Sequence, residues 1–280
     1  MTTMSMTTLR RPWIIAHRGA SAYAPENTMA AFRRAVEMGA GFIETDLHLT
    51  RDARFVGIHD ATLERTTNGR GAVRDFTLAE LRELDAGAWF DAKSKAKHDA
   101  ASAAERGAMS GGASAAKFAG ERIPTLEEIL EFAREANVTV YLEIKAGAAR
   151  GAENMLAGAL VAALGDALRG PQEAARVIVI SFDAELIASV RQRDAALVTG
   201  LLVEKGPADA VKRALQVGAR QLAPRRDMVT PALVERAHGA ELRVVPWTIN
   251  EPAEMRAAIA AGVDGIMTDY PDRLAALVKS

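Results

Sequence analysis

Short runs of Val, Ile and Leu alternate with alanine-rich segments of helical period along almost the whole chain. This alternation is typical of βα units, in which the strands lie parallel in one sheet and the helices cover its outer face. The spacing of the units favours one (β/α)8 barrel of the TIM type, a single domain over residues 1–280, rather than an open sheet. Nine runs have the character of strands: 13–17, 42–49, 55–60, 138–145, 176–182, 198–203, 220–224, 243–249 and 264–269.

The nine strand candidates exceed the eight places of such a barrel. Only residues 50–54 separate the second run from the third, which is too short for a crossover helix. We therefore expect one member of this pair to be an extension or a hairpin arm. Helices are expected at 26–38, 124–135, 151–168, 183–193, 207–217, 230–239, 251–261 and 271–279.

Residues 61–122 interrupt the βα alternation between a strand and the next helix. We interpret this stretch as a small insertion that forms a cap over the barrel mouth. Its second half, 92–120, is rich in Ala, Ser, Gly and Lys, a composition typical of a flexible low-complexity segment.

Composition limits the partners and the compartment. The chain has 35 basic and 36 acidic residues, and this balance gives no broad electrostatic reason to expect nucleic acid or an anionic membrane as a partner. It has no cysteine, which excludes disulfides and thiolate metal sites. We find neither a signal-type apolar segment nor a run long enough to span a bilayer, so we expect a cytoplasmic protein without stable membrane association. The oligomeric state stays open.

Carboxylates break the apolar pattern of two strands. Alternation places Glu44 and Asp46 on one face of the run 42–49, and it places Glu143 with Lys145 on one face of the run 138–145. If the two strands are neighbours, the three carboxylates converge on an all-oxygen site of the kind that Mg²⁺ or Ca²⁺ prefers. The alternative is that Glu44 and Glu143 form ion pairs with Arg18 and Lys145 along the lumen.

Two histidines end strands at the carboxyl end of the predicted barrel, where the active sites of such barrels lie. They are His17 and His59. Two imidazoles on either side of a phosphate can divide general-base and general-acid tasks, although each alone could be a hydrogen-bonded strand-end residue. His48 is ambiguous, and we expect no role for His98 or His238.

The motifs HRG, ENT, ExD and HD follow one another in AHRGASAYAPENTMAAFRRAVEMGAGFIETDLHLTRDARFVGIHD. Further pieces come in the order LEIK, ISF, WTIN and GVDGIMTDYP, so that the pattern spans nearly the whole chain. This series resembles the glycerophosphodiester phosphodiesterase family. The resemblance implies metal-dependent hydrolysis of glycerophosphocholine, glycerophosphoethanolamine and similar small diesters to sn-glycerol 3-phosphate and an alcohol.

The resemblance also assigns roles by position. It implies His17 and His59 as the acid/base pair, and Glu44, Asp46 and Glu143 as ligands of a divalent cation, Mg²⁺ or Ca²⁺. It further implies that Arg18 and Lys145 hold the phosphate, that Glu26 and Asn27 shape the site beside His17, and that Phe182 and Trp247 line the glycerol side.

Simpler readings remain for several of these residues. Glu26 and Asn27 could have no role beyond capping the helix that follows Pro25, and Phe182 and Trp247 could simply belong to the core. Residues 65–67 are interpreted as fixing the loop after His59.

Two alternative functions differ in class. One is a related barrel phosphodiesterase or phospholipase that acts on lipid or lysolipid headgroups, which an exposed apolar rim around the insertion would favour. The other is a non-catalytic phosphate-binding barrel, which would need Arg18 and Lys145 but would have no use for two histidines and three carboxylates.

Overall fold

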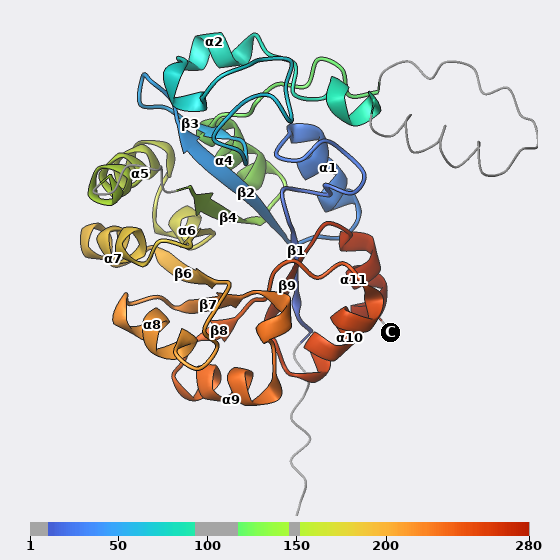
Figure 1. Cartoon of the computed structure of the whole chain (residues 1–280), viewed down its shortest axis with the longest axis vertical. Helices are drawn as coiled ribbons and strands as arrows, with labels where there is room; N and C mark the ends of the chain where they lie inside the picture. Colours follow the sequence, from blue (N-terminus) through green and yellow to red (C-terminus); the bar gives the residue numbers. More distant parts are fainter. Residues whose placement is uncertain (1–10, 93–116, 146–151, 280) are drawn as a thin grey trace, which may run out of the picture.

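Eight parallel strands form a closed barrel in the computed structural model, which describes residues 11–92, 117–145 and 152–279 (Figure 1). Around the barrel the strands follow the order β8-β7-β6-β5-β4-β2-β1-β9. Backbone hydrogen bonds between residues 244–249 and 264–267 join the two ends of this order and close the circle. The strands are β1 (Trp13–Ala16), β2 (Phe42–Leu49), β4 (Thr139–Ile144), β5 (Val177–Ser181), β6 (Val198–Val203), β7 (Gln221–Pro224), β8 (Arg243–Val244) and β9 (Gly265–Thr268).

The strand candidate at 55–60, the one in excess of the eight barrel places, is a hairpin arm. β3 (Phe55–Gly57) runs antiparallel to β2 and stays outside the barrel order, as the short connection predicted. Its position matters because His59 follows it directly. The hairpin thus carries His59 to the barrel mouth from outside the ring of parallel strands.

Helices follow most strands and cover the outside of the sheet (Figure 1). Thr28 caps α1, and Thr125 forms a capping box with Glu128 at the start of α4, the start that the sequence predicted. Outside the insertion, the described helices include one that the sequence did not predict, the short α6. Their bounds are α1 (Met29–Glu37), α4 (Leu126–Glu135), α5 (Glu153–Ala167), α6 (Pro171–Ala174), α7 (Ala184–Arg193), α8 (Ala210–Gln216), α9 (Pro231–Gly239), α10 (Pro252–Ala260) and α11 (Pro271–Lys279), with the 3-10 turn η2 (Arg226–Met228).

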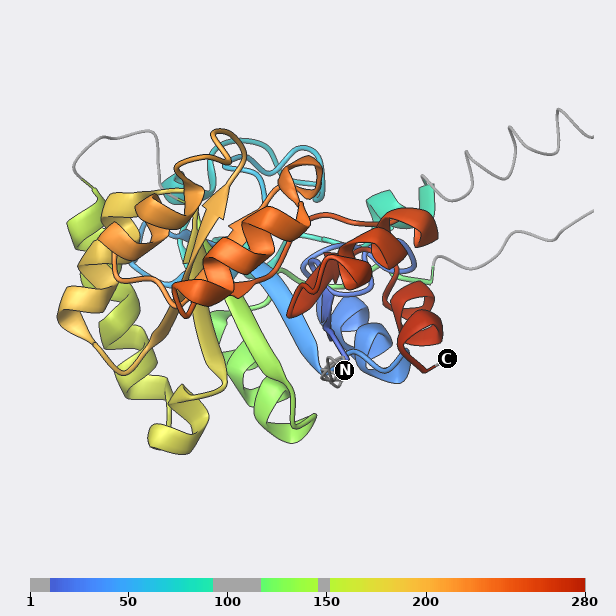
Figure 2. The ribbon, with the colours of Figure 1, turned by 90° about the horizontal axis from the view of Figure 1, so that it is seen from below.

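The described part of the insertion forms a small subdomain with its own apolar cluster. It contains η1 (Val73–Asp75) and α2 (Leu78–Arg82), and its cluster includes Leu63, Leu81 and Ile123. Figure 2 shows its loops (cyan) at the end of the barrel toward which the strands run. Residues 93–116, most of the predicted low-complexity segment, lie outside the described residues.

Apolar side chains occupy both sides of the sheet. Ile43 and Leu47 point outward to the helices, while Tyr141 and its neighbours fill the lumen. In the lumen, Trp13 stacks on Phe42 with ring centroids 5.0 Å apart, and the Tyr141 hydroxyl donates a 3.0 Å hydrogen bond to Gln221. None of the helices in the described ranges has the length and hydropathy that a bilayer span requires.

Candidate active site

Three buried carboxylates meet inside the barrel, at the carboxyl ends of β2 and β4. The two strands lie side by side with Asp46 opposite Glu143, and Glu44 lies two residues back along β2 on the same face. Oxygen atoms of the three residues lie within 4.8 Å of one another. The convergence predicted from the alternation of the two strands is confirmed.

The crowding of these carboxylates changes how they ionise. Burial and the neighbouring Asp46 charge raise the pKa of Glu44 to about 8, and the same two causes raise the pKa of Glu143. Burial would also raise the pKa of Asp46, but the charges of Lys145 and Arg18 outweigh it and hold that pKa well below 3.8. If all three carboxyl groups were ionised, three negative charges would face only two cationic side chains, Arg18 and Lys145.

The ion-pair alternative accounts for only part of this site. Lys145 Nζ lies 2.8 Å from Asp46 Oδ1 and also pairs with Glu143, and Arg18 Nε lies 3.2 Å from Asp46 Oδ2. Glu44 is different: its Oε2 accepts the Arg18 backbone N–H, while its Oε1 is buried and has no hydrogen-bond partner in the described part of the chain. A buried carboxylate oxygen without a partner, facing two further carboxylates, fits a hard divalent cation.

The turn after β1 explains why its motif ends in glycine. Arg18 and Gly19 both have left-handed backbone angles, with φ of 56° and 79°. A Cβ atom on Gly19 would lie 2.6 Å from the backbone carbon of Ala31 in α1. The turn thus packs directly against α1, which directs the Arg18 side chain back over the site, where its Nη1 donates to Glu26 at 2.9 Å.

Glu26 and Asn27 lie beside Arg18 and Asp46 and do not cap the helix. The cap of α1 is Thr28, whose hydroxyl accepts from the amide of Ala31. Asn27 instead donates from Nδ2 to Asp46 Oδ2 at 2.8 Å and accepts from the Thr45 hydroxyl at 2.8 Å. It lies at φ 56° and is almost fully buried, so its amide holds Asp46 in place from the side opposite Lys145.

His17 is oriented by a carboxylate that sequence reasoning did not select. Its Nδ1 lies 2.7 Å from Asp269 Oδ1, which also accepts from the Ser21 hydroxyl at 2.9 Å. Asp269 Oδ2 accepts from Asn250 Nδ2 at 2.6 Å. Burial would lower the pKa of His17, but the hydrogen bond with Asp269 and the charge of Glu44 raise it above 6.5. Asp269 follows β9 as His17 follows β1, so its strand-end position was the available signal.

His59 has an aspartate of its own. Its Nδ1 lies 2.6 Å from Oδ1 of Asp60, the next residue, which the HD motif already contained. Burial, together with the charges of Arg18 and Lys145, lowers the pKa of His59 below 6.5 even though Asp46 opposes the shift. Each imidazole thus meets a carboxylate through Nδ1, which leaves its Nε2 for other chemistry.

The remaining histidines lie away from this chemistry or outside the described residues. The ambiguity over His48 is resolved, since its Nε2 bonds the backbone carbonyl of His59 at 3.0 Å and so supports the hairpin. His238 pairs with Asp264 at 2.9 Å, on the segment that precedes β9. His98 lies outside the described residues.

A cavity of about 180 Å³ opens over the carboxylates. On its apolar side, Phe182 and Trp247 meet edge to face with ring centroids 5.1 Å apart. Phe182 is 40% exposed, so the core interpretation is wrong for it, whereas Trp247 is half-buried and donates to the carbonyl of Ala223 at 2.8 Å. The cavity is lined by His17, Arg18, Glu44, His59, Glu143, Lys145, Phe182, Leu202, Trp247, Thr248 and Met267.

A TIM barrel whose mouth gathers imidazoles, carboxylates and cationic side chains over one cavity has the architecture of a barrel enzyme. The model of the glycerophosphoryl diester phosphodiesterase family matches residues 17–273, and the chain belongs to this family of enzymes. Membership argues against the non-catalytic phosphate-binding alternative.

Individual relatives agree over nearly the full length. A glycerophosphodiester phosphodiesterase of Caldanaerobacter subterraneus is 39% identical over 266 residues, which cover 95% of this chain and 97% of that protein. One of Bacillus subtilis is 35% identical, with 92% of this chain and 83% of that protein covered. A solved structure of an Oleispira antarctica phosphodiesterase in complex with the product sn-glycerol-3-phosphate is similar with a TM-score of 0.79 and 27% identity, covering 96% of this chain and 97% of that one.

Proposed function

We propose that this protein hydrolyses small glycerophosphodiesters, such as glycerophosphocholine and glycerophosphoethanolamine, to sn-glycerol 3-phosphate and an alcohol. One observation carries the proposal: three buried carboxylates lie beside two strand-end histidines, and each histidine meets an aspartate through Nδ1. The product bound in the Oleispira antarctica phosphodiesterase supports the same choice of product.

Glu44, Asp46 and Glu143 are the proposed ligands of a divalent cation, Mg²⁺ or Ca²⁺. The all-oxygen donor set and the unpartnered Glu44 Oε1 support this assignment. When bound, such an ion supplies positive charge for the phosphate oxygens. Lys145 and Arg18 already contact these carboxylates, so they stand where they can also contact the phosphate and hold it in one orientation.

His17 and His59 are the proposed proton-transfer pair. In a first step, one imidazole accepts the proton of the glycerol 2-hydroxyl as its oxygen bonds to phosphorus, and the other protonates the departing alkoxide as its P–O bond breaks. The product of that step is a cyclic phosphate. Water then opens the ring while the two histidines exchange roles, which returns both to their starting protonation states.

Phe182 and Trp247 are proposed to pack against the carbon atoms of glycerol, on the side of the cavity away from the carboxylates. Glu26 and Asn27 hold Arg18 and Asp46, and thereby shape the phosphate side. We further propose that residues 1–280 form a single domain, that 61–122 act as a cap over the mouth, and that the protein works in the cytoplasm on free diesters. No nucleic acid or membrane partner is part of this proposal.

The test is release of sn-glycerol 3-phosphate from glycerophosphocholine by the purified protein. Activity is measured before and after EDTA, then with Mg²⁺ or Ca²⁺ restored, and in His17→Ala. His238→Ala is the matched control, because its imidazole also bonds an aspartate but lies outside the cavity. We expect EDTA and His17→Ala to abolish turnover while His238→Ala keeps it. Absence of turnover on every small diester with either cation contradicts the proposal.

A further inference from the structure

Arg65 lies in the insertion, on a turn that the small apolar cluster holds firmly. Leu63, two residues earlier, is fully buried in that cluster, and its carbonyl accepts from both the amide and the hydroxyl of Thr67. Arg65 itself is half-exposed and points away from the cluster toward the barrel. The packing of the insertion therefore fixes the backbone from which the Arg65 side chain extends.

The three guanidinium nitrogens of Arg65 form two bidentate pairs, one with each of two carboxylates. Nη1 and Nη2 donate to Glu26 at 2.8 Å each, and Nε and Nη2 donate to Asp60 at 2.6 and 3.0 Å. Bidentate pairs of this kind fix relative orientation as well as distance. Glu26 and Asp60 come from different segments, the loop after β1 and the loop after β3.

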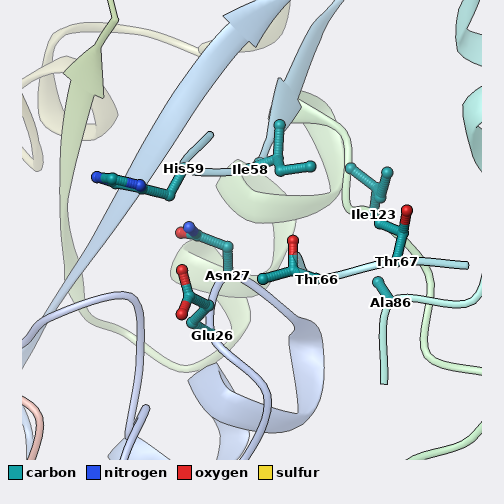
Figure 3. A pocket seen from close by; sticks show the side chains of 9 residues that line it. Glu26, Asn27, Ile58, His59, Thr66, Thr67, Ala86 and Ile123 are labelled. Atoms are coloured by element: carbon teal, nitrogen blue, oxygen red, sulfur yellow. The ribbon is translucent and has the colours of Figure 1, made fainter. Parts of the chain in front are cut away.

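Each of the two carboxylates also holds a group of the proposed reaction. Glu26 Oε1 accepts from Arg18 Nη1 at 2.9 Å, and Asp60 Oδ1 meets His59 Nδ1 at 2.6 Å. The result is a continuous chain of contacts, Arg18 to Glu26 to Arg65 to Asp60 to His59. Figure 3 shows Glu26, Asn27 and His59 together on one side of a pocket whose other side is formed by Thr67, Ala86 and Ile123.

Charge alternates along this chain of contacts. The hydrogen bond from Arg65 is the largest influence on Asp60 and holds its pKa at about 2. Glu26 is largely buried, which opposes its ionisation, yet its contacts with Arg65 and Arg18 lower its pKa. Without Arg65, Glu26 would have Arg18 alone as its cationic partner, and Asp60 would have only His59. The two carboxylates that hold Arg18 and His59 would then no longer be fixed relative to each other.

We propose that Arg65 is a positioning residue that sets the separation and orientation of the phosphate-binding Arg18 and the proton-transferring His59. Through this side chain the insertion takes part in catalysis without touching the substrate. The inference rests on the proposed function for the roles of Arg18 and His59, while the contacts that link them are observed in the structure.

The test compares Arg65→Ala and Arg65→Lys with a matched control, Arg82→Ala. Like Arg65, Arg82 lies in the insertion. Two of its guanidinium nitrogens donate at 2.8 Å each to the carboxylate of Glu128, which lies outside the insertion, but Arg82 contacts no residue that lines the cavity. We expect Arg65→Ala to lower kcat/KM at least tenfold, mostly through kcat, and Arg65→Lys to recover little, because an ammonium cannot form two forks. Arg82→Ala should keep kcat/KM within about threefold of the wild type.

A second readout does not depend on turnover. The ¹⁵N shifts of the His59 ring, assigned with His59→Gln, should change in Arg65→Ala and stay constant in Arg82→Ala. An active, folded Arg65→Ala with unchanged kcat/KM and unchanged His59 shifts would overturn the inference, and so would equal losses of activity in Arg65→Ala and Arg82→Ala. An inactive wild type would refute the proposed function instead, and the ring shifts would still decide whether Arg65 positions His59.

Discussion

Replacing Asp269 by asparagine keeps the shape of the side chain and removes one acceptor oxygen. In the native site both oxygens accept, Oδ1 from His17 and Ser21 and Oδ2 from Asn250. Asn250 cannot turn over freely, because its own carbonyl oxygen accepts from the Asp269 amide at 2.9 Å and from the Thr268 hydroxyl at 3.1 Å. The new NH₂ group therefore has to face His17.

Facing an NH₂ group, His17 Nδ1 must accept where it formerly donated. The ring proton then moves to Nε2, the nitrogen that must be unprotonated in the step in which His17 acts as the base. The lost charge-assisted hydrogen bond contributes about 1.5–3 kcal/mol, which predicts a fall in kcat/KM of roughly tenfold to about 150-fold, since each 1.36 kcal/mol is a factor of ten. Because Asp269 raises the pKa of His17, the limb of the pH–rate profile that reports this group should also move to lower pH.

The assay is sn-glycerol 3-phosphate release at saturating cation across a pH series, with thermal unfolding measured on the same samples. Ser21→Ala removes one hydroxyl from the same oxygen and leaves the charge, so we expect it to lower kcat/KM less than Asp269→Asn does. If Asp269→Asn stays folded and keeps kcat/KM within threefold of wild type with an unshifted profile, the reasoning about His17 is wrong.

Three further predictions concern stability, cation binding and the apolar side of the cavity. Gly19→Ala should lower the free energy of unfolding by about 2–5 kcal/mol, measured by urea titration. The substitution adds the cost of a left-handed alanine to the clash of a Cβ atom that would lie only 2.6 Å from the Ala31 backbone carbon; a loss below 1 kcal/mol would contradict this. Since its pKa is raised from 4.5 to about 8, Glu44 should lower the stability of the cation-free protein progressively between pH 4.5 and pH 8, with the loss complete above pH 8. An added cation should therefore raise Tm more at pH 9 than at pH 6. Glu44→Gln should raise Tm in EDTA at pH 9 and remove the response to Mg²⁺ or Ca²⁺, and a full response in that variant would argue against this ligand. Phe182→Ala should raise KM with little change in kcat, because it removes packing that is equal in the ground and transition states; a selective fall in kcat would exclude that role.

The convergence of the three carboxylates was predictable because their placement follows from strand geometry alone. Period-two alternation puts Glu44 and Asp46 on one face, and a parallel neighbour with Glu143 brings the third oxygen group beside them. The Tyr141 and Lys145 positions follow the same rule. Strand number was also predictable, but the sequence left open whether the extra candidate is an extension or a hairpin arm, and the structure shows the arm.

The partner of His17 could not be found from a local pattern. Asp269 is 252 residues away in sequence, and it meets His17 only because β9 pairs with β1 and closes the barrel. The bridge formed by Arg65 depends likewise on how the insertion folds back, and the distinction between Thr28 and Asn27 depends on a backbone angle. Such contacts are set by closure and loop conformation, which residue spacing does not encode.

The aromatic stack and the Tyr141–Gln221 hydrogen bond inside the lumen have a kinetic consequence. They fill the lumen below the carboxylates, so we expect the cavity to open at the barrel mouth and not through the barrel. In the proposed two-step reaction, the alcohol then leaves and the hydrolytic water enters through the same opening. The second step could then begin only after the alcohol has moved out past Phe182. A bulkier alcohol would slow the entry of water, and so the second step, even if it does not change the rate of the first bond cleavage.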